Sequence, residues 1–208
     1  MTDRTVTDQE FFWAGEFGDE YTERNAKAAF AANVALFAKI LGRAPGVASV
    51  LELGANRGNN LRAIRTLLPD VNLAAVEINQ KAFAELQSIE GIQARNGSIL
   101  DYQPTQQFDL VLLKGVLIHL NPDALPKAYE VIWRASHRYI CLCEYYNPTP
   151  VEVPYHGHSG KLFKRDFAGE ILDRYPLRLL DYGFVYRRDV FLQGDMTWFL
   201  LERCSVVS

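Results

Sequence analysis

A short apolar run that leads into a glycine-bearing turn constrains the fold of this chain more than any other feature. The apolar run covers residues 47–53, and the turn reads Gly54-Ala55-Asn56-Arg57-Gly58. Residues 59–68 then carry the pattern of a helix. Glycine allows the backbone to turn sharply and to approach a ligand closely. The pattern therefore predicts a buried strand, a ligand-facing turn and a helix in succession.

Strands and helices alternate along the rest of the chain. Apolar periodicity predicts further helices at residues 19–42, 79–88, 123–136 and 163–175. It predicts further strands at residues 71–78, 92–99, 108–114, 138–144, 177–186 and 196–203, with a long loop at 145–160. Such alternation predicts an α/β fold whose sheet is covered by helices on both faces. We expect seven strands, mostly parallel, with an antiparallel last strand.

Composition indicates one domain of ordinary size. The chain has 208 residues, of which 49% are hydrophobic and 23% charged, and its net charge is -3. That charge argues against an extended basic surface that binds nucleic acid. The first ten residues are polar and acidic, so we expect no signal peptide, and no apolar run approaches the roughly 18 residues that span a bilayer. We therefore expect a soluble, cytoplasmic protein with no nucleic-acid or membrane partner, either a monomer or a homodimer. Within the single domain, residues 1–45 are expected to form a lid and helix packed on a core at 46–208.

The cysteines predict neither a disulfide nor a metal site. Their odd number, three, fits a reducing compartment. Cys141 and Cys143 are expected to be small buried residues on opposite faces of one strand. His156 and His158 lack a third ligand at a convincing spacing, so no metal is expected.

Polar residues follow several of the predicted strands. Ligands bind outside the carboxyl ends of the strands in an open α/β sheet. Glu77 ends the second strand, where a carboxylate can accept hydrogen bonds from ribose hydroxyls. Ser98 and Ile99 follow the third strand, where they are expected beside an adenine ring, and Lys114 ends the fourth. The first N–H groups of the helix at 59–68 suit a phosphate or the carboxylate of an amino-acid-like cofactor.

The turn separates two classes of cofactor. A dinucleotide-binding turn reads Gly-x-Gly-x-x-Gly, but here Asn56 and Asn59 interrupt that pattern. The sequence instead resembles class I S-adenosylmethionine (SAM)-dependent methyltransferases, whose pattern Glu/Asp-x-Gly-x-x-x-Gly is matched by Glu52, Gly54 and Gly58. The segment Phe108-Asp109-Leu110-Val111 is also typical of that class.

This resemblance implies a Rossmann-like class I methyltransferase fold, with SAM as cofactor and S-adenosylhomocysteine as product. Gly54 would face the methionine part of SAM and Glu77 its ribose, while the class often has Asp where Ser98 stands. Trp13 and Tyr21 are expected in a lid over SAM, or alternatively in an aromatic patch that packs the first helix on the sheet. The expected cofactor-binding residues are Glu52, Gly54, Asn56, Gly58, Asn59, Glu77, Ile78, Ser98, Ile99, Lys114, Trp13 and Tyr21.

Three further segments narrow the resemblance. They are residues 12–21, 144–148 and 156–166. Together with the glycine turn, they look like the bacterial pseudaminic acid biosynthesis-associated methylases over almost the whole chain. That family implies a methyl acceptor among nonulosonic-acid-type sugars or sugar nucleotides, modified at an amino or hydroxyl group.

Methyl transfer from SAM is an in-line displacement that depends chiefly on positioning. A general base is needed only where the acceptor must lose a proton. The catalytic candidates are His119, Glu144 and Tyr146. His119 could alternatively make structural hydrogen bonds, and Glu144 could form an ion pair with Lys161 or Arg165.

The long loop and its flanks supply the expected acceptor-binding residues. These are Tyr145, Asn147, His156, His158, Lys161 and Arg165. Two other functions stay open. One is a SAM-binding regulatory or assembly protein without activity. The other is an NAD-dependent oxidoreductase, which the missing third glycine disfavours.

Overall fold

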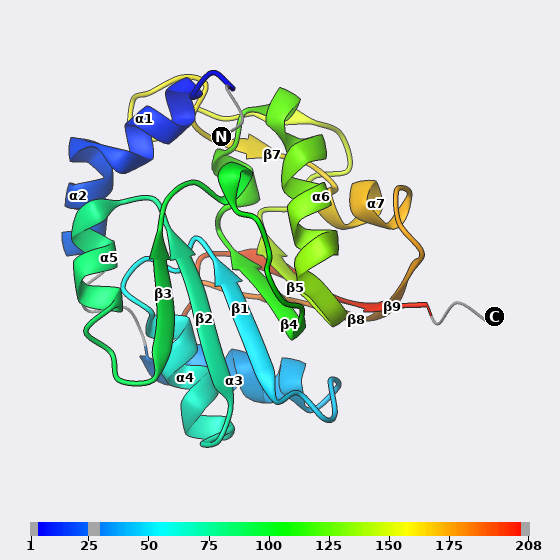
Figure 1. Cartoon of the computed structure of the whole chain (residues 1–208). Helices are drawn as coiled ribbons and strands as arrows, with labels where there is room; N and C mark the ends of the chain where they lie inside the picture. Colours follow the sequence, from blue (N-terminus) through cyan, green and yellow to red (C-terminus); the bar gives the residue numbers. More distant parts are fainter. Residues whose placement is uncertain (1–3, 25–29, 205–208) are drawn as a thin grey trace.

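A seven-stranded sheet forms the centre of the molecule in the computed structural model, which describes residues 4–24 and 30–204 (Figure 1). The strand order is β3-β2-β1-β4-β5-β9-β8. Strands β1 to β5 are parallel, and β9 runs antiparallel to both of its neighbours, as expected from the sequence. The bounds are β1 Ser49–Leu53, β2 Asn72–Glu77, β3 Ile92–Asn96, β4 Phe108–Lys114, β5 Ser136–Glu144, β8 Leu177–Val185 and β9 Met196–Arg203.

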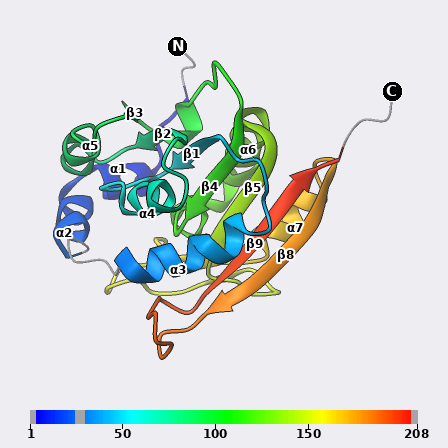
Figure 2. The ribbon, with the colours of Figure 1, turned by 90° about the horizontal axis from the view of Figure 1, so that it is seen from below.

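Helices cover both faces of this sheet (Figure 2). One face carries α3 (Phe30–Leu41) and α4 (Asn59–Leu67), and the other carries α6 (Leu125–Ala135) and α7 (Phe167–Leu172). Helix α5 (Gln80–Leu86) connects β2 to β3. The arrangement confirms the α/β class and the Rossmann-like topology.

Side chains alternate between two hydrophobic clusters along β4. Leu110 and Leu112 face the cluster with α3 and α4, whereas Val111 and Leu113 face the cluster with α6 and α7. This follows from the two-residue repeat of a strand. A strand buried on both faces has no polar alternation, which explains why the sequence shows a continuous apolar run at 108–114.

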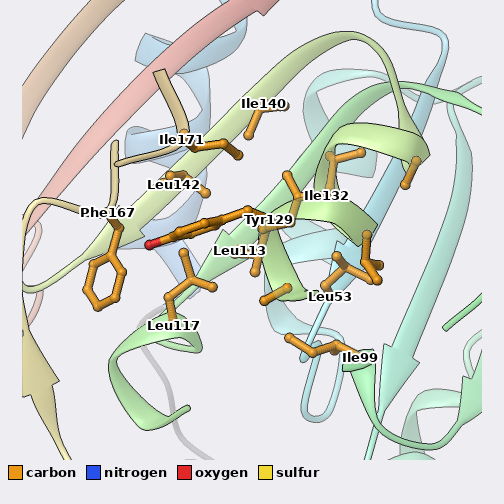
Figure 3. Packing of buried hydrophobic residues seen from close by; sticks show 14 of the residues in the cluster. Leu53, Ile99, Leu113, Leu117, Tyr129, Ile132, Ile140, Leu142, Phe167 and Ile171 are labelled. Atoms are coloured by element: carbon orange, nitrogen blue, oxygen red, sulfur yellow. The ribbon is translucent and has the colours of Figure 1, made fainter. Parts of the chain in front are cut away.

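Tyr129 of α6 is a large, fully buried residue of the second cluster. Its ring lies among Leu113, Leu142 and Phe167 (Figure 3). Its hydroxyl donates a 2.8 Å hydrogen bond to the carboxylate of Glu170, so the buried polar end is satisfied. Burial of one such side chain stabilises the fold by about 1.5–3 kcal/mol.

The N-terminal segment is more helical than expected. Helices α1 (Asp8–Ala14) and α2 (Glu16–Arg24) precede α3. The predicted helix at 19–42 therefore covers the end of α2 and all of α3, and residues 25–29 between them lie outside the described residues. Helix α1 begins with a capping box, in which the Thr7 side chain accepts from the Glu10 N–H and Glu10 accepts from the Thr7 N–H. The division into a lid at 1–45 and a core at 46–208 stays a prediction.

The segment after β5 differs from the expected loop and helix. A two-stranded sheet joins β6 (Val151–Glu152) to β7 (Phe163–Lys164), so the predicted helix at 163–175 is wrong at its start. Helix α7 begins later, because Asp166 caps it by accepting from the Gly169 N–H at 2.8 Å. Short 3-10 turns complete the fold: η2 (Ile99–Asp101), η3 (Leu117–His119) and η4 (Pro122–Ala124).

Cys141 and Cys143 share one face of β5, so the expectation of opposite faces is wrong. Residues two apart on a strand point the same way. Both side chains are buried free thiols, with their sulfur atoms 3.9 Å apart. Within residues 4–24 and 30–204, no helix has the length and apolar character needed to cross a membrane.

Candidate functional site

The turn after β1 has a backbone that suits glycine. Gly54 and Gly58 have φ angles of 79° and 76°, and Asn56, between them, has a φ of 48°. A side chain at Gly54 would also place its Cβ 2.6 Å from Cγ2 of Val116, in the loop after β4. The turn therefore needs glycine at position 54 both for its conformation and for its close packing.

Glu77, at the end of β2, is bonded to the loops on both sides. One carboxylate oxygen accepts from the Asn56 N–H at 2.7 Å, and the other accepts from the Asn79 N–H at 2.7 Å. Burial raises the pKa of Glu77, and the backbone N–H bonds act against that rise. Each oxygen keeps acceptor capacity for a ligand hydroxyl, because a carboxylate accepts about four hydrogen bonds.

A cavity of about 350 Å³ lies at the carboxyl ends of β1 to β4. It brings together most of the expected cofactor-binding residues, and His119 with them. Those on its wall are Trp13, Tyr21, Gly54, Asn56, Asn59, Glu77, Ile78, Ser98, Ile99, Lys114 and His119. Gly58 instead caps α4. The wall also holds polar residues that the sequence did not point to: Gln9, Glu10, Asn33, Asn60, Asn79 and Gln193.

Glu52 lies behind the cavity wall and is fully buried. It accepts a 2.6 Å hydrogen bond from the side chain of Asn60, which is on the wall. Its other oxygen, Oε2, has no hydrogen-bond partner among residues 4–24 and 30–204. Burial raises the pKa of Glu52 to about 8, against the Asn60 bond and the charge of Lys114. A cationic group placed nearby would favour the ionised form.

His119 lies in η3 and is buried at one end of the cavity. Its Nδ1 is 2.7 Å from the carbonyl oxygen of Lys161. A carbonyl can only accept, so Nδ1 carries the proton and Nε2 of the neutral ring is an acceptor. Burial lowers the pKa of His119 to about 4, although the bond to Lys161 raises it. The ring is therefore neutral near pH 7, with a fixed tautomer.

Ser98 belongs to a network that ties the N-terminal segment to the loop after β3. Arg4 donates to both carboxylate oxygens of Asp101 at 2.7 Å, to Ser98 Oγ at 3.2 Å and to Glu10. Burial raises the pKa of Glu10, but hydrogen bonds from Arg4 and Ser98 lower it to about 2. Leu100 N–H also donates to Ser98 Oγ at 3.1 Å. These bonds hold α1 over one end of the cavity.

The family comparison agrees with this geometry. Residues 50–137, from β1 to the start of β5, match the model of a family described as a methyltransferase domain. Compared with curated protein sequences, the chain shows no match.

Solved methyltransferases share the fold of the whole chain. A Burkholderia thailandensis 1,6-didemethyltoxoflavin-N1-methyltransferase, solved with S-adenosylhomocysteine, has a TM-score of 0.70 at 17% identity, covering 98% of this chain and 94% of that one. Magnesium protoporphyrin IX methyltransferase from Synechocystis PCC 6803, solved with SAM, has a TM-score of 0.67 at 12% identity, covering 97% and 100%. The glycopeptide N-methyltransferase MtfA with SAM has a TM-score of 0.64 at 14% identity, covering 83% and 93%. The fold is thus the class I methyltransferase fold.

Aromatic residues from the N-terminal helices and from the long loop meet at the cavity. The Trp13 ring is 4.4 Å from the His119 ring and 5.1 Å from the Tyr21 ring, measured between centroids. Tyr155 of the long loop lies 5.0 Å from His119 and 5.8 Å from Phe17. Trp13 and Tyr21 line the cavity and also pack within an aromatic cluster, so the two alternatives given for them do not exclude each other.

His156 and His158 contact this cluster from outside the cavity wall. Their rings lie 6.0 Å and 5.7 Å from Phe17. Lys161 closes the same region, because its ammonium donates to the Asp8 carbonyl at 3.2 Å and lies 5.0 Å above the Phe12 ring. These expected acceptor-binding residues hold the long loop against α1 in this conformation.

Glu144 supports the loop after β4 and does not line the cavity. Its Oε1 accepts from the N–H groups of Val116 and Leu117, both at 3.0 Å. Burial raises the pKa of Glu144 to about 7, against these backbone bonds. It makes no ion pair with Lys161 or Arg165 within the described chain; Arg165 pairs with Glu170 at 2.5 Å.

The remaining acceptor-side candidates lie away from the cavity wall. Tyr146 is 44% exposed, with its ring 6.0 Å from that of Phe199. Asn147 donates to the Thr149 carbonyl, and the Tyr145 ring lies under the ammonium of Lys164 at 5.2 Å. The geometry thus leaves His119 as the catalytic candidate that lines the cavity.

Proposed function

We propose that the chain transfers a methyl group from SAM to an amino or hydroxyl group of a small-molecule acceptor. The observation that carries the proposal is Glu77, buried at the carboxyl edge between the turn and Asn79, on the wall of a cavity that reaches His119. The methyltransferase domain match supports it, as do the neighbours of the same fold that were solved with SAM or S-adenosylhomocysteine.

The residues on the wall fit the parts of SAM. Glu77 has acceptor capacity for the ribose hydroxyls, and Ile78 and Ile99 offer apolar contact to adenine. The unpartnered oxygen of Glu52 suits a cation such as the α-ammonium group, reached through a shift of the Asn60 side chain or a bridging water. When bound, SAM supplies a methyl group on a cationic sulfonium. The chain's own part is to hold the two reactants in line and exclude water.

His119 would orient the acceptor. Its Nε2, kept neutral and unprotonated, can accept a hydrogen bond from an amine N–H or a hydroxyl. That hydrogen bond orients the lone pair of the methyl-acceptor atom. Nε2 then receives the proton of the acceptor during or after methyl transfer. An acceptor without an N–H or O–H group would leave this buried nitrogen unpaired.

The proposed acceptor class is a nonulosonic-acid-type sugar or sugar nucleotide. This rests on the resemblance of residues 144–148 and 156–166 to the pseudaminic acid biosynthesis-associated methylases. Such sugars carry both amino and hydroxyl groups, the donors that His119 would accept. The alternative is a SAM-binding regulatory protein, which the low pKa of His119 favours because a weak base accelerates proton removal less.

Calorimetry with SAM tests the first step. We expect binding to the wild-type protein and a loss of about 10- to 100-fold in affinity for Glu77→Ala, since charged hydrogen bonds are lost. Glu90→Ala, at an exposed position just before β3 and off the cavity wall, is the control. No binding of SAM to the folded protein would refute the proposal.

Incubation with SAM carrying an isotope-labelled methyl group tests the second step. Mass spectrometry should find the label on an amino or hydroxyl group of a nonulosonic acid or its nucleotide-linked form. Binding of SAM without label transfer to any acceptor in a broad panel would favour the regulatory alternative.

A further inference from the structure

Ser98, which the sequence predicts beside adenine, already has other hydrogen-bond partners. Ser98 Oγ accepts from the N–H of Leu100 at 3.1 Å and from Arg4 at 3.2 Å. A hydroxyl has one proton to donate and two lone pairs to accept with. Both acceptor positions of Ser98 are therefore occupied, so another group must accept from an amine at this end of the cavity.

Gln9 of α1 presents such a group. It is 7% exposed and lines the cavity next to Glu10. Its Nε2 donates a 2.8 Å hydrogen bond to the carbonyl oxygen of Gly160. Because a carbonyl only accepts, this bond fixes which end of the carboxamide is nitrogen. The oxygen, Oε1, is buried and finds no hydrogen-bond partner in the part of the chain that the structure describes.

An unpartnered buried oxygen costs free energy unless a ligand supplies a donor. The other unpartnered polar atom of α1, Nε1 of Trp13, is a donor and so cannot accept from an amine. The Glu10 carboxylate already accepts from Arg4 and from Thr7. Gln9 Oε1 is thus the acceptor on α1 that remains for a ligand N–H.

We propose that Gln9 Oε1 accepts a hydrogen bond from the exocyclic amine of adenine and selects for that base. This inference rests on the proposed function, because it requires SAM in the cavity. The adenine would lie between Ile78 and Ile99, below α1, with its amine directed away from Glu77 and toward the helix. Selection of the base would then come from α1.

The experiment compares S-adenosylhomocysteine with its 6-deamino analogue, in which purine replaces adenine. Calorimetry gives both affinities for the wild-type protein, for Gln9→Leu and for the control Gln106→Leu at an exposed site. We expect the wild type and the control to bind S-adenosylhomocysteine about tenfold more tightly than the analogue. In Gln9→Leu the ratio should fall close to one.

The ligand pair separates base selection from a purely structural role of Gln9. If Gln9 only fastens α1 to Gly160, Gln9→Leu weakens both ligands equally and the ratio stays unchanged, which overturns the inference while SAM binding stands. Equal affinity of the two ligands for the wild type also overturns it. If neither ligand binds the wild type, the proposed function itself fails. Gln9→Met, closer in volume, replaces Gln9→Leu if that variant does not fold.

Discussion

The Nδ1 atom of His119 lies 2.7 Å from the carbonyl oxygen of Lys161, 42 positions later in the chain. This bond joins η3, beyond the carboxyl end of β4, to the end of the long loop, between β6 and β7. It fixes the ring tautomer and turns Nε2 into an acceptor. The reactivity of the cavity therefore depends on where the long loop places one backbone carbonyl.

His119→Gln should lower kcat by about 10²- to 10⁴-fold, because the acceptor loses its oriented hydrogen-bond partner. SAM affinity should change little. With saturating SAM, kcat of the wild type should not fall at about pH 6.5, the ordinary value for histidine. The fall in kcat that protonation of His119 causes should appear only near its pKa of about 4, since the ring stays neutral above that value.

The control for this variant is His137→Gln, at an exposed histidine of β5. Stopped-flow or discontinuous assays of labelled methyl transfer give kcat across the pH range. A His119→Gln variant with unchanged kcat would remove His119 from the chemistry and leave it a structural residue.

SAM affinity should rise with pH as Glu52 ionises. Burial raises the pKa of Glu52 to about 8, and a cationic ligand favours its carboxylate form. Binding below that pKa must then release a proton, so affinity should change by up to about tenfold for each pH unit. Calorimetry in buffers of different ionisation enthalpy measures the proton release directly.

Glu52→Gln supplies the comparison for this pH dependence. It keeps an oxygen to accept from Asn60 and is neutral at every pH. Its SAM affinity should be weaker at about pH 8 and flatter with pH than that of the wild type. Parallel pH curves for the two proteins would show that Glu52 does not respond to the ligand.

Gly54→Ala should destabilise the protein through two separate effects. The added Cβ meets Val116 Cγ2 at 2.6 Å, and the φ of 79° costs a non-glycine residue about 1–2 kcal/mol. The double variant Gly54→Ala/Val116→Ala removes the steric contact but keeps the backbone cost. Denaturant unfolding should therefore show that Gly54→Ala lowers the free energy of unfolding less in the Val116→Ala background than in the wild type. Full additivity of the two substitutions would mean that the contact is not limiting.

Glu144→Gln should stabilise the protein at alkaline pH. The folded-state pKa of Glu144, about 7, lies above its ordinary value of 4.5, so the folded state holds a proton that the unfolded chain loses. Stability from this group is present below the unfolded pKa and is lost as pH rises through the folded one. The glutamine variant lacks this loss, and its advantage should approach about 3 kcal/mol at about pH 8.5.

The same variant should match the wild type at about pH 4, where Glu144 is protonated in the folded state and largely protonated in the unfolded chain. Urea unfolding at the two pH values gives the comparison. Glu202→Gln is a contrasting control, because its pKa is lowered by Arg178 and Arg138 despite partial burial, and its removal should destabilise near neutrality. A constant difference between Glu144→Gln and the wild type would contradict the buried-carboxylate explanation.

The sequence predicts the carboxyl-edge residues well for a simple geometric reason. Parallel strands end at one edge, so residues that follow β1 to β4 must gather there. Gly54, Glu77, Ser98 and Lys114 need no knowledge of long-range packing to be placed on one wall.

The N-terminal residues of the cavity are harder to predict. Thr7 and Glu10 carry the signature of a capping box, which marks the start of α1. Their sequence gives no sign that Gln9 meets Gly160 or that Arg4 meets Asp101, because those contacts span 151 and 97 positions. Only the folded chain brings these groups together.

Glu144 shows a second limit of prediction from the sequence. Its position at the end of β5 places it at the expected edge, but strand geometry does not say which way a terminal side chain turns. Here the carboxylate turns to the N–H groups of Val116 and Leu117, whose loop has no strand partner for them. A buried donor that needs an acceptor overrides the expectation of a ligand contact.

The antiparallel strand β9 has a consequence for how the protein is made. During translation β8 leaves the ribosome before β9, yet β9 occupies the place between β5 and β8 in the sheet. The outer strand of the sheet thus has nothing to pair with until its inner neighbour has been synthesised. A chain interrupted before Met196 would expose the edge of β5 and an unpaired β8 together, a combination that invites aggregation.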